Sequence, residues 1–157
     1  MITYIELNAV LTDSGIRQEA IQIFDEEFVL PTSHWITHDL GASLDKFFFD
    51  TGIKFGYNQY ECNKFAKTAT TIADWSWAKT KTRDVALAFG MFGYIGGVDG
   101  HMINIAVHRD SASKLYLAFY EPQPFVAEGE MAFRLVCLTQ KTLSKEDIRS
   151  CISCLFL

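Results

Sequence analysis

Hydrophobic and polar residues follow a helical period in the first half of this chain and a strand-like period in the second. From 62 to 73 the apolar positions recur every three or four residues, which is typical of the buried face of a helix. These positions are Cys62, Phe65, Ala66, Ala69, Ile72 and Ala73. From residue 101 on, "HMINIAVHR" and "KLYLAFYE" alternate around the turn-forming "DSAS", which predicts a β-hairpin. Helices followed by an antiparallel sheet predict an α+β fold, and 157 residues suit a single domain over 1–157.

Weaker patterns in the N-terminal third predict three further elements. Residues 2–10 alternate weakly, so we expect a strand there. Ser14 can cap a helix that runs to about Phe28. A second helix is expected over 33–50, and Gly52 would end it, because glycine accepts the left-handed conformation common at helix C-termini.

The C-terminal half holds a glycine-rich segment, a third strand and a last helix. Residues 84–100 lack the Gly-Lys-Ser/Thr ending of a phosphate loop, and we interpret them as a flexible connection into a strand. "MAFRLVCLTQ" predicts a third strand of the sheet. The last helix should begin at Ser144, with Asp147 at the capping-box position, and continue into "CLFL".

Composition narrows the classes of function. The net charge is −5 and there is no basic run, so nucleic acid is not an expected partner. No apolar stretch reaches the roughly 18 residues of a membrane span, so we expect no membrane association. The N-terminus does not read as a signal peptide. We therefore expect a cytoplasmic protein, in its own or a host cell, whose four cysteines stay reduced.

Cys62 occupies the position of a nucleophile at a helix start. Asn58 is a good N-cap, and Glu61 completes an N-x-x-E pattern like a capping box, so Cys62 falls in the first helical turn. The positive end of the helix dipole stabilises a thiolate there. A buried cysteine at the same place would instead be a packing residue, so the functional interpretation depends on a partner base.

The hairpin supplies a base and a carboxylate. If its two fully apolar faces coincide, a three-residue loop at 110–112 places His101 directly opposite Glu121. A register shift of two positions leaves them diagonal neighbours. A carboxylate on an imidazole orients the ring and stabilises its charge, so Cys62, His101 and Glu121 fit the roles of nucleophile, base and orienter.

The stretches "YECNKFA", "GHMINIAV" and "FYEPQ" resemble the papain-like protease domain at the C-terminus of the Marasmius agglutinin and related bacterial and phage domains. The resemblance covers about 57–123. It implies a papain-like fold with a catalytic triad at Cys62, His101 and Glu121, and a protein or peptide substrate. Gln59 and the Cys62 backbone N–H are candidate oxyanion donors. The agglutinin protease requires calcium, but its ligands do not map onto this sequence, so we predict no cofactor and no metal site.

Two other functions remain open. A peptidoglycan-cleaving amidase of the CHAP class has Cys, Gly-His on a strand and Glu in the same order. A catalytically silent module that binds a host or partner protein would keep the fold and lose the reactivity. A thiol-reactivity assay separates the silent module from the two hydrolases. Asn104 lies on the strand face opposite His101, and we assign it a structural role.

Other chemistry-bearing residues receive structural interpretations. His34 and His38 are spaced i, i+4, which could hold a metal on a helix, but no third ligand is evident in the sequence. A single C-x-x-C, Cys151 and Cys154, supplies only half of a zinc site, and we place both on the apolar side of the last helix. Cys137 should be a core residue of the third strand.

The end of the chain is apolar. We expect Leu155, Phe156 and Leu157 to dock on the domain or on a second copy of it, because exposed patches of this kind favour association. The second option would give a homodimer through the apolar C-terminus.

Overall fold

The computed structural model describes residues 1–53, 61–80, 85–96, 99–123 and 138–156. Their strands form a six-stranded sheet with the order β2-β9-β5-β6-β7-β8 and a small sheet with the order β1-β3-β4. The strands are β1 (Ile2–Thr3), β2 (Ile21–Ile23), β3 (Glu27–Val29), β4 (Ala86–Leu87), β5 (Phe89–Gly96), β6 (Asp99–Arg109), β7 (Leu115–Glu121), β8 (Thr139–Lys141) and β9 (Cys151–Phe156). The helices are α1 (Tyr4–Asp13), η1 (Gln18–Ala20), η2 (Trp35–Leu40), α2 (Gly41–Thr51), α3 (Cys62–Thr80) and α4 (Lys145–Arg149).

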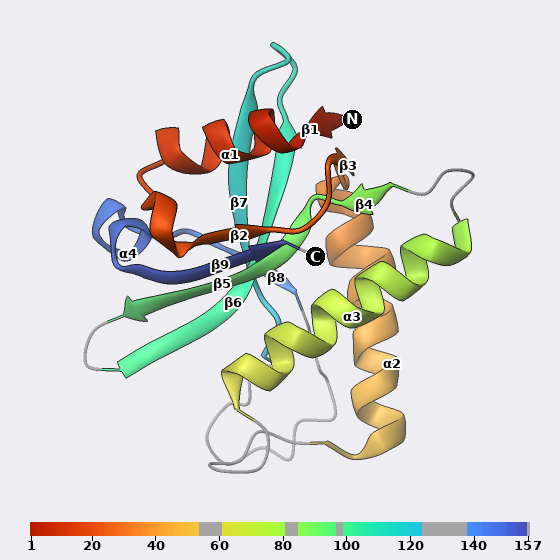
Figure 1. Ribbon diagram of the computed structural model, residues 1–157. Helices are drawn as coiled ribbons and strands as arrows, with labels where there is room; N and C mark the ends of the chain where they lie inside the picture. Colours follow the sequence, from red (N-terminus) through yellow and green to blue (C-terminus); the bar gives the residue numbers. More distant parts are fainter. Residues whose placement is uncertain (54–60, 81–84, 97–98, 124–137, 157) are drawn as a thin grey trace.

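Helices cover both faces of the large sheet (Figure 1). On one face, α1 packs over β6 and β7 through Leu7 and Leu11. On the other face lie η2, α2 and α3, whose Phe48 and Phe65 pack with Ala106 of β6. The predicted α+β class is confirmed, and the arrangement is compatible with a papain-like fold. The sheet is mixed and not purely antiparallel, because β2 pairs with β9 in parallel.

The expected strand over 2–10 is wrong, because a helix occupies most of it. Only Ile2 and Thr3 are extended, and α1 follows. The Thr3 hydroxyl accepts from the Glu6 backbone N–H, and the Glu6 carboxylate accepts from the Thr3 backbone N–H, which is a complete capping box. Leu7 and Leu11, both buried, give the helical spacing that the weak alternation obscured.

The expected helix from Ser14 to Phe28 is also wrong. Ser14 caps the C-terminus of α1, and Gly15 then adopts a φ of 98°, which glycine accepts without strain. A short 3₁₀ turn and the strands β2 and β3 follow. Pairing with strands from other parts of the chain determines the conformation of this segment, since β2 pairs with β9, and β3 pairs with both β1 and β4.

The helix expected over 33–50 is confirmed, with one irregularity. Its first part, η2, is a π-helix that continues directly into α2. Gly52 ends it with a φ of 65°, as predicted from the glycine.

The glycine-rich segment is a central strand and not a flexible connection. Residues 89–96 form β5, which pairs with β6 on one side and β9 on the other. A Cβ at Gly90 would collide with the carbonyl oxygen of Leu155 in β9. Glycine at this position therefore allows β5 and β9 to approach closely, and its presence does not indicate a flexible segment.

The last helix begins as predicted and ends early. Ser144 and Asp147 form the capping box of α4, but α4 stops at Arg149. The chain then enters β9, so the prediction that Cys151 and Cys154 lie on a helix is wrong. Both are buried in the sheet.

The apolar end of the chain docks on its own domain. Phe156 is fully buried and packs edge-on against Phe28. Leu155 pairs with Gln22 and Met91, and Leu157 lies outside the described residues. The homodimer stays a prediction. Of the third predicted strand, the structure describes β8, and Cys137 lies outside the described part.

The β6–β7 hairpin is confirmed with a register shifted by two positions. Asn104 pairs with Tyr120 and Arg109 with Leu115, so the predicted direct opposition of His101 and Glu121 is wrong and the two are diagonal. The loop closes on Asp110, whose carboxylate accepts the backbone N–H of Lys114. That side-chain bond favours a loop one residue later than the sequence suggested.

Candidate active site

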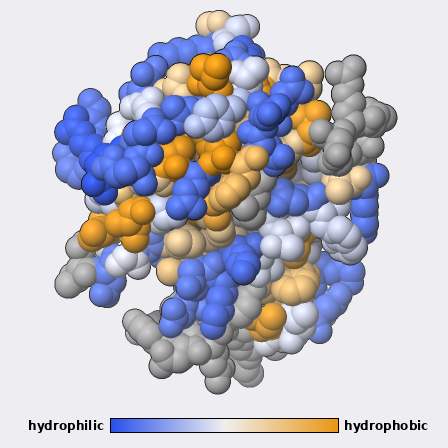
Figure 2. Space-filling model, viewed as in Figure 1, coloured by the Kyte–Doolittle hydropathy of each residue, from blue (hydrophilic) through white to orange (hydrophobic). Residues whose placement is uncertain are grey.

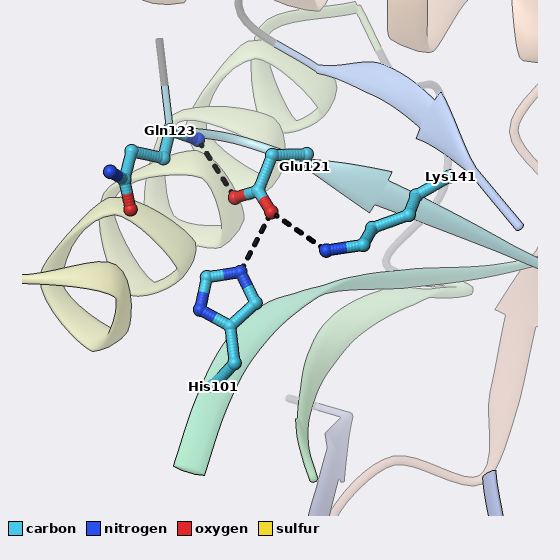
Figure 3. Close-up of polar contacts among 4 residues, drawn as sticks. All are labelled: His101, Glu121, Gln123 and Lys141. Atoms are coloured by element: carbon cyan, nitrogen blue, oxygen red, sulfur yellow. Dashed lines mark hydrogen bonds and ion pairs between the residues drawn. The ribbon is translucent and has the colours of Figure 1, made fainter. Parts of the chain in front are cut away.

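His101 and Glu121 are in direct contact where β6 begins and β7 ends. His101 Nε2 lies 2.7 Å from Glu121 Oε2, and the two side chains are 27% and 21% exposed. Diagonal neighbours on antiparallel strands remain within reach for long side chains. The predicted His–Glu pair is therefore confirmed as a contact (Figure 3), and both side chains remain partly exposed.

Glu121 is held by two further groups. Its Oε1 accepts the backbone N–H of Gln123 at 3.2 Å, and its Oε2 also contacts Lys141 Nζ at 3.4 Å. Burial lowers the pKa of Lys141, but a hydrogen bond with Tyr94 and the charge of Glu121 outweigh it, so the pKa is raised overall. The carboxylate is thus fixed on both oxygens before any substrate binds.

The contact with Glu121 determines which imidazole nitrogen is free to react. A carboxylate oxygen accepts, so Nε2 carries the proton in that bond. Nδ1 points away from Glu121 (Figure 3) and is left as the acceptor in the neutral ring. The ring of Tyr94, on β5, lies edge-on to His101 with 5.9 Å between centroids and limits the positions that the imidazole can take.

Cys62 lies at the same end of the molecule, as the first residue of α3. Asn104 Nδ2 donates to the Ala66 carbonyl and the Thr70 hydroxyl at 3.0 Å each, which fixes α3 on β6. The helix α3 and the strand β6 begin at the same end of the molecule (Figure 1). Cys62 therefore lies before the Asn104 contact along the helix, and His101 lies before it along the strand. Cys62 is half-buried.

The thiol and the imidazole approach this end from different sheet faces. Ala106, which alternates with Asn104, packs with α3, whereas Ile103, which alternates with His101, packs in the opposite core. Within the described residues, the structure joins His101 to Glu121 and shows no hydrogen bond between Cys62 and His101.

Asn104 has the structural role predicted for it. It is fully buried, and Nδ2 also contacts the Gly90 carbonyl of β5 at 3.0 Å, so one side chain ties α3, β5 and β6 together. Its Oδ1 is buried and has no hydrogen-bond partner among the described residues. Loss of this amide would disturb the position of the start of α3.

The sheet face that α3 covers carries apolar side chains beyond the start of this helix, and they are exposed or half-buried. Met102 and Ile152 both pack over Gly93, where a Cβ would lie 3.3 and 3.5 Å from them. Ile95, two residues on from Gly93, and Ile152 are 52% and 54% exposed. We call Ile95, Met102 and Ile152 the apolar shelf; Figure 2 shows hydrophobic side chains where β5 ends.

Several predictions cannot be placed. Gln59 and Asn58 lie outside the described residues, so the oxyanion assignment stays a prediction. The described part of the chain contains no group of three or more His, Cys, Asp or Glu side chains that could hold a metal. Among the described helices, none is long and apolar enough to cross a membrane. His34 and His38 stack, with 4.1 Å between ring centroids, on the exposed side of η2.

Sequence reasoning missed Lys141, Tyr94 and Ile152 as neighbours of the site. Lys141 and Ile152 reach it only through the pairing of β8 with β7 and of β9 with β5, which no local pattern encodes. Tyr94 pairs with His101, and recognition of 89–96 as a strand would have placed it there.

Among solved structures, the chain is similar in fold to that of a "PSL1a-E64 complex", with a TM-score of 0.62 and 20% sequence identity. The match covers 78% of this chain and 44% of that chain, so this chain spans less than half of its length. At this identity the likeness shows the fold alone. No protein-family model and no curated protein matches the sequence.

Proposed function

We propose that the protein is a cysteine hydrolase that cleaves a peptide or isopeptide bond with Cys62, His101 and Glu121. The observation that carries the proposal is the His101–Glu121 hydrogen bond at the end of the molecule where α3 begins with Cys62. An imidazole that a carboxylate holds in place can activate a cysteine thiol at a helix start once the two groups come into contact.

The reaction assigns one task to each side chain. The Cys62 thiolate attacks the carbonyl carbon and forms a C–S bond, while the protonated His101 donates from Nδ1 to the leaving amine as the C–N bond breaks. Water then gives a proton to Nδ1 and attacks the thioester; the C–S bond breaks, the carboxylic acid leaves, and Cys62 is again a thiolate beside the protonated imidazole. Glu121 holds Nε2 throughout and stabilises the imidazolium.

The thiol and Nδ1 must come within hydrogen-bond reach for this chemistry. In ligand-free enzymes such contacts are often long and tighten only when substrate binds. The backbone N–H groups of Cys62 and Asn63 begin α3 and are the candidate donors in this region, whereas those of Lys64 and Phe65 already donate to the Glu61 carbonyl. The N–H groups of Cys62 and Asn63 would stabilise the developing oxyanion, and Gln59 is the second candidate donor.

The apolar shelf supports a peptide substrate with an apolar side chain near the scissile bond. The shelf lies on the sheet face that α3 covers, beyond the start of that helix, and Met102 directly follows His101. A peptide bound there would bury Ile95 and Ile152, which are otherwise exposed.

Selective alkylation tests the proposal. Iodoacetamide at pH 6.5 should label Cys62 well before the other cysteines, with sites assigned by peptide mapping. Cys151 and Cys154 are internal controls, since burial raises the pKa of Cys151 to about 11 and that of Cys154 well above its usual range. An epoxide inhibitor of cysteine proteases, followed by intact mass measurement, serves as a second probe. Cys62→Ala should lose both adducts.

The result also separates the alternatives. If Cys62 reacts no faster than a cysteine in an unfolded peptide, the hydrolase proposal is wrong and the silent binding module replaces it. If Cys62 is activated but only peptidoglycan fragments are cleaved, the CHAP-like amidase is correct, since it shares the nucleophile and differs in substrate.

A further inference from the structure

Lys141 contacts the same carboxylate oxygen of Glu121 as His101 does. It lies on β8 opposite Phe119, so it is a diagonal neighbour of Glu121 on the same sheet face. Its Nζ lies 3.4 Å from Glu121 Oε2, the oxygen that His101 Nε2 contacts at 2.7 Å (Figure 3). One carboxylate oxygen therefore faces an ammonium and an imidazole at once.

Tyr94 keeps Lys141 in this position. The Lys141 ammonium lies 5.9 Å from the centre of the Tyr94 ring, and interaction with Tyr94 raises the pKa of Lys141. The side chain is 36% exposed. An isolated ion pair at such exposure contributes little to stability, so its effect should be sought on the neighbouring imidazole and not in the free energy of unfolding.

Titratable groups on four elements lie at this end of the molecule. Lys141 on β8 is positive and Glu121 on β7 is negative, Tyr94 on β5 lies edge-on to the imidazole, and Cys62 starts α3. With Lys141 present, Lys141 and Glu121 already cancel, so protonation of His101 creates a net positive cluster. Without Lys141, the same protonation would neutralise Glu121. A nearby like charge disfavours the charged form of a group.

We propose that Lys141 is a positioning residue that fixes Glu121 and opposes protonation of His101. The lysine offsets part of the stabilisation that the carboxylate gives to the imidazolium. The base therefore releases its proton at lower pH than a His–Glu pair alone would allow, and the carboxylate still holds the ring. The inference rests on the proposed role of His101, but its test does not depend on turnover.

The test is an NMR titration of the His101 ring, assigned with a His101→Gln variant among the four histidines. Lys141→Met keeps the aliphatic stem and removes the charge. Its His101 midpoint should rise by about half to one pH unit, as expected for one partly solvated unit charge within several ångströms. Lys141→Gln provides a second neutral variant. Lys141→Arg should restore the wild-type midpoint, because it keeps the charge.

A matched control removes a lysine from the turn end of the β6–β7 hairpin, far from His101 and Glu121. Lys114 is exposed beside the turn, so Lys114→Met changes the net charge equally and should leave the midpoint within about 0.2 pH unit of wild type, since exposed charges far apart are screened. The proposal is overturned if both neutral variants titrate like wild type, or if Lys141→Arg shifts as far as Lys141→Met. Unreactive Cys62 would refute the hydrolase and leave this titration result standing.

Discussion

The strand β6 carries two histidines in opposite situations. His108, near its end, is 4% exposed, and its Nδ1 lies 2.7 Å from the Pro31 carbonyl oxygen. Its Nε2 lies 2.7 Å from the Tyr120 hydroxyl. A carbonyl only accepts, so Nδ1 donates to Pro31; in the neutral ring that burial favours, Nε2 is left as the acceptor facing the Tyr120 hydroxyl.

His101, at the start of the strand, has a carboxylate as its partner and remains accessible. Burial lowers the pKa of His108, although its bond to Pro31 acts in the other direction. The two residues are of the same type and lie on the same strand, so the difference between them comes from the burial of each imidazole and from the group that it contacts. His108 suits a structural contact, and His101 suits proton transfer.

The largest expected effect is on the exposed histidine. His101→Ala should lower turnover, or the alkylation rate of Cys62 at pH 6.5, by roughly 10²–10⁴-fold, because the base is lost. Stability should change little, since the side chain is partly solvated. Single-turnover rates and thermal melting measure the two quantities. A variant that melts early and keeps its reactivity would reverse the assignment of the two histidines.

The converse substitution should act on stability. His108→Leu removes the partner of the Pro31 carbonyl and leaves the Tyr120 hydroxyl with only the longer bond to Ser33, at an expected cost of about 2–4 kcal/mol in the free energy of unfolding. Denaturant unfolding measures it, with His101→Leu as the matched control. The alkylation rate of Cys62 per folded molecule should equal that of wild type. Equal losses of stability in both variants would contradict the comparison.

The smallest effect concerns pH. Because the folded protein lowers the pKa of His108 below its ordinary value of about 6.5, the unfolded chain binds more protons at mildly acidic pH. The stabilisation from neutral His108 is complete above that value and is lost as pH falls below it. Unfolding free energies at pH 7.5 and 5.5 should therefore differ more in wild type than in His108→Leu. The same difference in both proteins would show that other groups control the acid response.

The sequence predicted the fold class and the contact between His101 and Glu121 better than the elements that surround this contact. The hairpin and the His101–Glu121 contact follow from local periodicity, since the apolar faces of two adjacent strands must coincide. The helix with Cys62 in its first turn was also predicted, but it begins at Cys62 itself and not directly after Asn58. The diagonal register allowed the same contact because a histidine and a glutamate are long enough to span two positions.

Elements that depend on distant partners could not be predicted. Residues 21–29 have apolar residues at helical spacing, yet they pair as strands with β9 and with β1 and β4. Residues 151–156 continue a helix in the sequence pattern, and β5 draws them into the sheet. Tertiary context overrides weak local propensity in both segments. Lys141 was missed for the same reason.

The place of β9 in the sheet sets an order of events during synthesis. This strand lies between β2 and β5, so Ile21 can pair with Cys154 only after all the residues between them have been synthesised. Contacts between such distant residues close slowly because loop entropy opposes them. Cys151 pairs with Tyr94, the ring beside His101. A nascent chain from which β9 has not yet emerged therefore lacks the strand that supports β5 beside His101.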